Sequence, residues 1–329
     1  MRLVECVPNI SEGKDKNKIQ QILKELAAVN GVEILGCEPG QSANRTVITF
    51  IAPPEIIGQA ALKLIKKSAE ILDMSKHKGV HPRIGCVDVF PFVPYKKISL
   101  EECAEIARNT AREVGQNLEI PVYLYGAAAI NPAYNELRFL RKGGYENLPA
   151  KMAEFPPDFG PKSYNEKVAK TGALCIGARN FLIAYNINLN TKDLTAAKAL
   201  AKELRAQIVG IKTLAWYIDE YGFCQVSINI EDYKKAPLYL VYETCKNLAN
   251  KFDIKVTGSE VIGLLPKEVL LDSAKFYLNK QNRIIQGLPH EEVFDIVIKN
   301  LNLSEISPFV PEEKILELKL KSAKNQGIF

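Results

Sequence analysis

The sequence predicts an α/β (α+β) fold made of two ferredoxin-like βαββαβ subdomains, with antiparallel or mixed sheets, helices on one face of each sheet and a substrate groove between the subdomains. Three observations lead to this prediction. The expected order of strands and helices, βαββαβ, occurs twice along the chain. The 329 residues suffice for two domains that each bury a core. Hydrophobic residues make up 47% and charged residues 25% of the sequence, as in ordinary globular proteins.

The first half of the chain contains the first copy of this order. Ile19, Ile22 and Leu26 recur at helical spacing and predict the first helix. Pro54 opens a second helix, and the stretch from Ser99 to Glu102 has the form of a capping box that starts a third. The strands expected in this half cover residues 2–8, 32–37, 46–51, 85–92 and 122–125.

Residues 131–172 show neither the periodicity of a helix nor the alternation of a strand. They accumulate Pro, Gly, Asn and Lys, with residues 160–172 as the most loop-like part, so we interpret them as an interdomain region. The expected domains are residues 1–178 and 179–329. In the second copy of the order, the expected strands cover residues 180–188, 210–218, 223–230 and 254–261. The expected helices cover residues 191–205 and 237–250. Terminal helices follow residue 266 and look like packing elements.

Charge and cysteine content narrow the class of protein. Lys and Arg number 43 and Asp and Glu 38, giving a formal net charge of +5. This charge is too small to indicate a nucleic-acid-binding protein but suits an anionic small substrate. The seven cysteines have no CxxC spacing and are expected to be reduced core residues, and no zinc, Walker, Rossmann or GxSxG motif occurs. Without an export signal or a long apolar run, we expect a cytoplasmic protein that binds no metal, membrane or nucleic acid.

Residues 77–94, HKGVHPRIGCVDVFPFVP, contain two of the three histidines. Gly79 and Pro82 interrupt helical geometry, so His77 and His81 cannot form a metal pair on one helical face. We expect His81 to lie on a loop that leads into a strand. Its imidazole is the best candidate for a general acid or base, because an ordinary pKa of ~6.5 lets it accept and donate protons near neutral pH.

A second site candidate is the polar loop of residues 38–45, which is longer than a tight hairpin requires. Basic side chains cluster on this loop and on the histidine loop, where they could pair with substrate carboxylates. The candidate binding residues of the two loops are Asn44, Arg45, Lys78 and Arg83.

A carboxylate is expected to assist the histidine. Glu38 or Asp88 could orient His81 or accept its proton, as carboxylates commonly do for catalytic imidazoles. The sequence does not decide which of the two carboxylates assists His81.

Seven motifs, spread almost from end to end, resemble those of one known family. They are CVPNISEG (6–13), NRTV (44–47), DMSKHKGVHPRIGCVDVFPFVP (73–94), VYLYG (122–126), PDFGP (157–161), GARNFLIAYNINL (177–189) and WYIDE (216–220). On these motifs the chain is similar to the formiminotransferase domain of glutamate formiminotransferases. That domain has two α/β halves with a folate groove between them, which agrees with the double βαββαβ order.

This resemblance implies transfer of the formimino group of N-formimino-L-glutamate to N5 of tetrahydrofolate. The products would be 5-formiminotetrahydrofolate and L-glutamate, a step of histidine degradation and one-carbon metabolism. Tetrahydrofolate would be the co-substrate, without a metal, and the family suggests a homodimer. Since the chain stops at Phe329, we expect no fused cyclodeaminase domain of the kind that follows in animals.

The resemblance also implies roles for residues. It places the catalytic histidine of the HPRIG motif on His81 and a catalytic asparagine of the VPN motif on Asn9, and Glu38 stands where the family has an aspartate. The folate-binding loop of the family corresponds to residues 160–172. Its candidate residues are Gly160, Pro161, Lys162, Ser163 and Gly172.

The strand expected over residues 223–230 has one polar face. Val226 and Ile228 alternate with Gln225 and Asn229. If the polar face lines the groove, its amides fit the donors and acceptors of a pterin ring, and Asn188 would join them.

Two other functions stay open. One is ATP-dependent cyclisation of 5-formyltetrahydrofolate, or another folate-dependent one-carbon activity on the same scaffold. The other is a non-catalytic folate-binding protein, against which the presence of His81, Asn9 and both loops argues.

Overall fold

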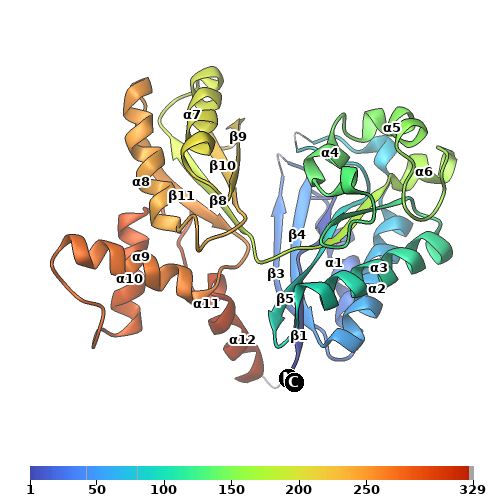
Figure 1. Ribbon diagram of the computed structural model, residues 1–329, viewed down its shortest axis with the longest axis horizontal. Coiled ribbons are helices and arrows are strands. Elements are labelled where there is room, and N and C mark those ends of the chain that lie inside the picture. The colour runs from blue at the N-terminus through green and yellow to red at the C-terminus, as the bar shows by residue number, and fades with distance from the viewer. Residues whose placement is uncertain (42, 80, 326–329) are drawn as a thin grey trace. The chain divides into compact units, whose positions relative to one another are not determined.

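The computed structural model describes residues 1–41, 43–79 and 81–325 and forms two compact units, Met1–Asn180 and Phe181–Phe329 (Figure 1). Residues 42 and 80, which belong to the two predicted site loops, lie outside the described residues. Both units are mixed helix-and-sheet structures, and the predicted fold class is confirmed. Among the described residues, no helix combines the length and apolar character that crossing a membrane requires.

One sheet organises the first unit. Its order is β3, β4, then β1 with β2, then β5, β7 and β6. The strands up to β5 pair antiparallel, whereas β7 pairs parallel with β5 and with β6, so the sheet is mixed as predicted. The strands are β1 (Leu3–Cys6), β2 (Asn9–Ile10), β3 (Glu33–Gly40), β4 (Arg45–Ala52), β5 (Val87–Lys96), β6 (Val122–Gly126) and β7 (Leu174–Ala178).

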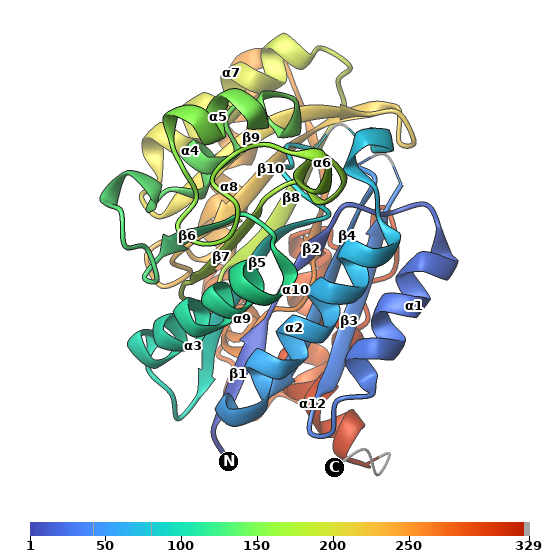
Figure 2. The same ribbon diagram turned by 90° about the vertical axis from the view of Figure 1, so that its right-hand side faces the viewer.

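Three long helices cover one face of this sheet: α1 (Lys16–Ala27), α2 (Pro54–Ile71) and α3 (Leu100–Glu113) (Figure 2). The predicted capping box is present, because the Ser99 side chain accepts from the backbone N–H of Glu102 and the Glu102 carboxylate accepts from that of Ser99. Short helical turns accompany these helices: η1 (Met74–Lys76) precedes β5, and η2 (Val114–Leu118) extends α3.

The expectation that residues 131–172 form an interdomain region is wrong. They belong to the first unit and form α4 (Leu137–Arg141), α5 (Leu148–Glu154), α6 (Glu166–Thr171), η3 (Pro132–Tyr134) and η4 (Tyr145–Asn147). Their side chains, including Leu140 and Met152, pack on the alternate residues of β6, Tyr123 and Tyr125, whose neighbours Val122 and Leu124 join the core under the long helices. Helices of five to seven residues are too short to give a periodic signal. At this end the sheet is therefore covered on both faces, not on one as predicted.

The second unit repeats the order βαββαβ with an all-antiparallel sheet, arranged β11, β8, β10, β9. Its elements are β8 (Ile183–Leu189), α7 (Leu194–Gln207), β9 (Ile211–Ile218), β10 (Phe223–Ile230), α8 (Leu238–Ala249), η5 (Asn250–Phe252) and β11 (Val256–Ile262). Four helices follow: α9 (Lys267–Lys280), α10 (His290–Asn300), α11 (Pro311–Lys314) and α12 (Leu316–Asn325).

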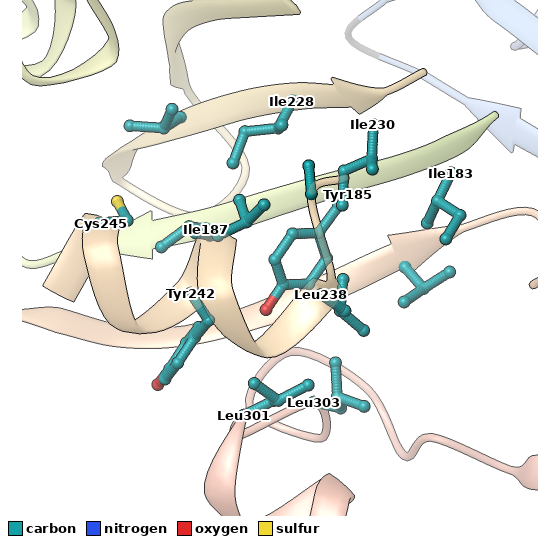
Figure 3. Packing of buried hydrophobic residues seen from close by; sticks show 14 of the residues in the cluster. Ile183, Tyr185, Ile187, Ile228, Ile230, Leu238, Tyr242, Cys245, Leu301 and Leu303 are labelled. Atoms are coloured by element: carbon teal, nitrogen blue, oxygen red, sulfur yellow. The ribbon is translucent and has the colours of Figure 1, made fainter. Parts of the chain in front are cut away.

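The core of the second unit lies on one face of its sheet. Figure 3 shows Tyr185 and Ile187 of β8 and Ile228 of β10 beside Tyr242 of α8. Leu301, from the segment after α10, packs in the same cluster. The terminal segments thus complete this core, as their sequence indicated.

Candidate active site

Asn44 ties together three segments of the first unit. Its side-chain Oδ1 accepts from the backbone N–H of Gly13 at 3.0 Å, and its Nδ2 donates to the carbonyl of Lys78 at 2.8 Å. Its own carbonyl accepts from Nε2 of His77 at 2.8 Å. The residue has a φ of 46°, in the left-handed region that asparagine tolerates better than most residues. Asn44 therefore fixes the predicted histidine loop against the loop that precedes β4.

Glycine at position 79 is needed where these loops touch. A Cβ on Gly79 would lie 2.3 Å from the carbonyl oxygen of Ala43, closer than atoms can approach. The two loops predicted from sequence are thus in direct backbone contact, and this contact places His81 beside Arg45.

His81 is a neutral imidazole in this arrangement. Its Nδ1 lies 2.7 Å from the carbonyl of Pro82. Nη1 of Arg45 lies 2.6 Å from Nε2 and 3.0 Å from Nδ1, so Nε2 is its nearer partner and the carbonyl is the nearer partner of Nδ1. A carbonyl only accepts and a guanidinium only donates, so we assign the proton to Nδ1 and the lone pair to Nε2. Burial, then the charges of Arg45 and Arg141, lower the pKa of His81 to about 2, against the opposing effect of the Pro82 carbonyl.

Two arginines act on this histidine, and one of them, Arg141, pairs with a buried carboxylate. Asp88 on β5 is completely buried; one oxygen accepts from the backbone N–H of Ile84 at 3.0 Å, and the other forms an ion pair with Arg141. Burial opposes the charged form of Arg141, but Asp88 outweighs it and raises the pKa of Arg141. Burial, followed by repulsion from Arg141, lowers the pKa of Arg45 to about 10. The cluster therefore holds two cations and one anion around a neutral imidazole.

Arg83 points to a different set of partners. Its Nε donates to Nδ1 of His77 at 3.1 Å, and its two terminal nitrogens donate to the carboxylate of Glu146 at 2.9 and 2.7 Å. Burial lowers the pKa of His77. The Arg83 guanidinium, predicted to bind a substrate carboxylate, thus already binds a carboxylate of the protein and links the histidine loop to η4.

The other predicted residues of the first unit lie on strands and in the 160–172 loop. Asn9 on β2 is buried, and its Nδ2 donates to the carbonyl of Val7 at 3.1 Å. Glu38 lies on β3 opposite Val47 of β4 and is partly exposed. The Lys78 side chain is exposed beside the carbonyl that Asn44 binds.

The loop glycines have a conformational role. Gly160 and Gly172 both have positive φ, and a Cβ would lie 2.3 Å from the Ile120 carbonyl oxygen at the first and 2.2 Å from that of Ile84 at the second. Lys162 donates to the carbonyl of Asp158 at 2.9 Å. Pro161 is partly exposed and Ser163 is exposed.

In the second unit, the polar face of β10 forms a hydrogen-bonded network. Nε2 of Gln225 donates to Oδ1 of Asn188 at 2.7 Å and to Oε1 of Glu260 at 2.9 Å, and its Oε1 accepts from the indole N–H of Trp216 at 3.1 Å. Asn188 in turn donates to Glu305 at 2.6 Å. Gln225 and Asn188 are buried, so this part of the polar face is shielded from water.

Register explains how this network is built. Gln225 lies opposite Asn188 on β8, and Asn188 lies opposite Gly258 on β11. A Cβ on Gly258 would lie 2.2 Å from Oε2 of Glu305, so this glycine leaves the space that the Glu305 carboxylate occupies. Asn229, predicted to share the face, is exposed.

Sequence reasoning missed several polar residues at these sites. Arg141 and Glu146 lie in the segment without periodicity, and Glu305 lies in the terminal segment expected only to pack. A pattern search could have found Glu260, since it lies on a predicted strand. Within the ranges 1–41, 43–79 and 81–325, no group of three or more His, Cys, Asp or Glu side chains is arranged to hold a metal ion.

The chain matches two family profiles. The N-terminal subdomain of the formiminotransferase domain matches residues 3–179, and the formiminotransferase domain matches residues 184–321. The chain is 42% identical to a glutamate formimidoyltransferase of Thermoplasma acidophilum, over 84% of this chain and 93% of that one. It is 36% identical to a glutamate formimidoyltransferase of Streptococcus pyogenes, over 85% of this chain and 95% of that one.

Longer relatives also match. The chain is 40% identical to a formimidoyltransferase-cyclodeaminase of Mus musculus over 96% of its own length, and it spans 59% of that protein. The family matches cover both halves of the chain, as the resemblance of the seven motifs predicted. The chain therefore belongs to the formiminotransferase family.

Proposed function

We propose that this protein is a glutamate formimidoyltransferase, which transfers the formimino group of N-formimino-L-glutamate to N5 of tetrahydrofolate. The observation that carries the proposal is the neutral His81, whose Nδ1–H is held by the Pro82 carbonyl so that Nε2 carries a lone pair. The names of the Thermoplasma and Streptococcus relatives support the same activity. Tetrahydrofolate is then a co-substrate.

The reaction requires two proton movements. N5 of tetrahydrofolate attacks the formimino carbon, and a tetrahedral carbon forms while the C=N bond becomes a single bond. The proton leaving N5 passes to Nε2 of His81. The imidazolium then gives a proton to the glutamate nitrogen, the bond from that nitrogen to the carbon breaks, and the C=N bond reforms. One imidazole thus completes the cycle unchanged.

The charges around His81 suit anionic substrates. An imidazole with a pKa of about 2 is a weak base in the free protein. Carboxylates of the substrates oppose the fields of Arg45 and Arg141 and raise this pKa toward neutrality, where proton transfer is efficient. Binding of substrate therefore makes His81 a better base.

The remaining predicted residues belong to this proposal. Asn9 and Glu38 would act beside His81. Asp88 would position Arg141, because its two oxygens bind that arginine and the Ile84 N–H. The proposed binding residues are Asn44, Arg45, Lys78, Arg83, Gly160, Pro161, Lys162, Ser163, Gly172, Asn188, Gln225 and Asn229.

Cellular setting and assembly are part of the same proposal. All seven cysteines are free thiols, which suits a reducing compartment, and we place the enzyme in the cytoplasm as a homodimer. Fractionation of the source cells and light scattering of the purified protein test these two points.

The test is an assay of purified protein with tetrahydrofolate and formiminoglutamate, following 5-formiminotetrahydrofolate. His81→Ala should lower turnover by about 10²- to 10⁴-fold. His290→Ala is the matched control and should leave turnover unchanged, since His290 contacts Lys267 in the second unit. Turnover only with 5-formyltetrahydrofolate and ATP would identify the cyclisation instead, and folate binding without any turnover would identify a binding protein.

A further inference from the structure

Arg141 carries a buried donor that the described residues do not satisfy. Its Nε atom is inaccessible and has no hydrogen-bond partner in the described part of the chain, while another nitrogen of the same guanidinium pairs with Asp88. Buried N–H groups of native proteins nearly always have a partner. A donor held in place by an ion pair and left without a partner is suited to a ligand that supplies an acceptor.

The charged groups around this donor also carry an excess of positive charge, which favours a ligand that is an anion. Arg45 from β4 and Arg141 from α4 supply two cations, Asp88 from β5 supplies one anion, and His81 is neutral. Burial and, after it, repulsion from Arg141 lower the pKa of Arg45, so one more anion beside the two guanidinium groups would stabilise their charged forms. The site thus lacks one negative charge.

We propose that Arg45 and Arg141 together bind the α-carboxylate of the formimino donor, and that this binding draws Arg45 away from Nε2 of His81. The inference rests on the function proposed above. It assigns to Arg141 a substrate contact and to Arg45 a second role, because the guanidinium that covers the lone pair of His81 is also a ligand for the substrate.

The chemistry of the two substrates selects this carboxylate. In N-formimino-L-glutamate the α-carboxylate is attached to the carbon that bears the reacting nitrogen. In tetrahydrofolate the carboxylates are separated from N5 by the pterin ring, a methylene group and the aminobenzoyl group. Near a histidine that moves protons between N5 and the glutamate nitrogen, the donor's α-carboxylate is therefore the substrate anion closest to the reaction.

The proposal also explains how the base is kept inactive. Nε2 accepts a hydrogen bond from Arg45 at 2.6 Å, so its lone pair is not available to N5 of tetrahydrofolate. A carboxylate is a stronger acceptor for a guanidinium than an imidazole nitrogen, and it can accept two hydrogen bonds at once. When Arg45 turns to the carboxylate, the lone pair becomes accessible and the added negative charge favours protonation of His81.

The test is NMR of protein with ¹⁵N-labelled histidine, since the chain has only three histidines. N-acetyl-L-glutamate serves as an unreactive donor analogue, and its α-carboxamide, N-acetyl-isoglutamine, as the matched ligand control. We expect the acid to shift the Nε2 signal of His81 and to raise its pKa, with smaller effects on His77 and none on His290. Equal shifts with both ligands, or no shift with the acid, would overturn the proposal.

Variants test the arginine separately. Arg141→Gln combined with Asp88→Asn removes both charges of the buried pair, while the amide oxygen introduced at position 88 can still accept from the Ile84 N–H, so folding is preserved better than in the single variant. This pair should weaken N-acetyl-L-glutamate binding on the order of tenfold or more. Lys142→Gln, an exposed neighbour, should not. Unchanged affinity in the double variant, with the fold intact by circular dichroism, would overturn the inference.

The outcomes separate this inference from the proposed function. Normal turnover of formiminoglutamate by the Arg141 and Asp88 double variant would contradict the inference about the carboxylate but would still support the proposed function. Absence of turnover with any donor in the wild-type protein, together with acid-specific binding at His81, would remove the function and leave the anion site.

Discussion

The two units share the order βαββαβ but differ in the polar groups that their sheets present. In the first unit, His81 contacts Arg45 and is influenced by Arg141, which pairs with the buried Asp88. In the second, the amides of Asn188 and Gln225 lie between carboxylates and an indole N–H. Charged groups near an imidazole control its proton affinity, whereas neutral amides can match the hydrogen-bond donors and acceptors of a bound ligand. Under the proposed function, the first unit would perform the chemistry and the second would recognise a substrate.

The largest expected effect concerns the close contact of Gly172 with the backbone of Ile84, whose N–H binds Asp88. Gly172→Ala places a Cβ 2.2 Å from the Ile84 carbonyl at a φ of +66°, so we expect a loss of about 3 to 4 kcal/mol in the free energy of unfolding. Gly222→Ala in the second unit is the control, because its φ is +73° but no atom lies within 4 Å; it should lose about 1 kcal/mol. Chemical denaturation of both variants measures the difference, and equal losses would contradict a steric role for Gly172.

A smaller effect concerns the buried carboxyl of Glu5 on β1. Burial, only partly opposed by Arg179, raises the pKa of Glu5 from 4.5 to about 7. Between these values the folded protein keeps a proton that the unfolded chain releases, so stability falls as pH rises through this window and then levels off. Glu5→Gln should match the wild type near the lower value and exceed it by about 3 kcal/mol above pH 7.

Unfolding curves at several pH values check this prediction. The exposed variant Glu113→Gln serves as the control for loss of a surface carboxylate. A constant difference between Glu5→Gln and the wild type at all pH values would show that the carboxyl of Glu5 does not titrate on folding.

The sequence predicted elements well where one period runs over a whole strand or helix. The bounds of β10 agree with the predicted residues 223–230, and Val226 and Ile228 are buried as their alternation required. The histidine loop was also predictable, since Gly79 and Pro82 exclude a helix there, but its contact with the loop before β4 was not predicted. Local patterns of this kind are encoded within a few residues.

The hydrogen-bond and ion-pair partners of the predicted site residues were not predictable, because they lie far away in the sequence. Arg141 reaches Asp88 across 53 positions of sequence, and Glu305 reaches Asn188 across 117. Arg141 ends a helix of five residues that has no periodic signal. Only the folded chain brings such groups together, so the sequence could not show that Asp88 pairs with Arg141.

The amide network of the second unit allows a sharper test of the comparison. Gln225→Glu replaces the Nε2 donor by an acceptor that faces Oδ1 of Asn188 and the carboxylate of Glu260. We expect a loss of about 1 to 3 kcal/mol in unfolding free energy, together with weaker tetrahydrofolate binding. Asn229→Asp makes the same change on an exposed residue of the strand and should have little effect on stability. If both variants lose stability equally, the network does not depend on the Gln225 donor.

The smallest expected effect on stability comes from the equivalent change in the first unit. Asn44→Asp keeps the acceptor for Gly13 but removes the donor to the Lys78 carbonyl, which costs about 1 kcal/mol. The transfer rate should fall by more than stability does, because the histidine loop loses a tether while His81 itself is unchanged. Asn44→Gly keeps the positive φ and removes both side-chain bonds, so its rate should fall further. If the first unit performs the chemistry as proposed, an unchanged rate in both variants would mean that the position of His81 does not depend on Asn44.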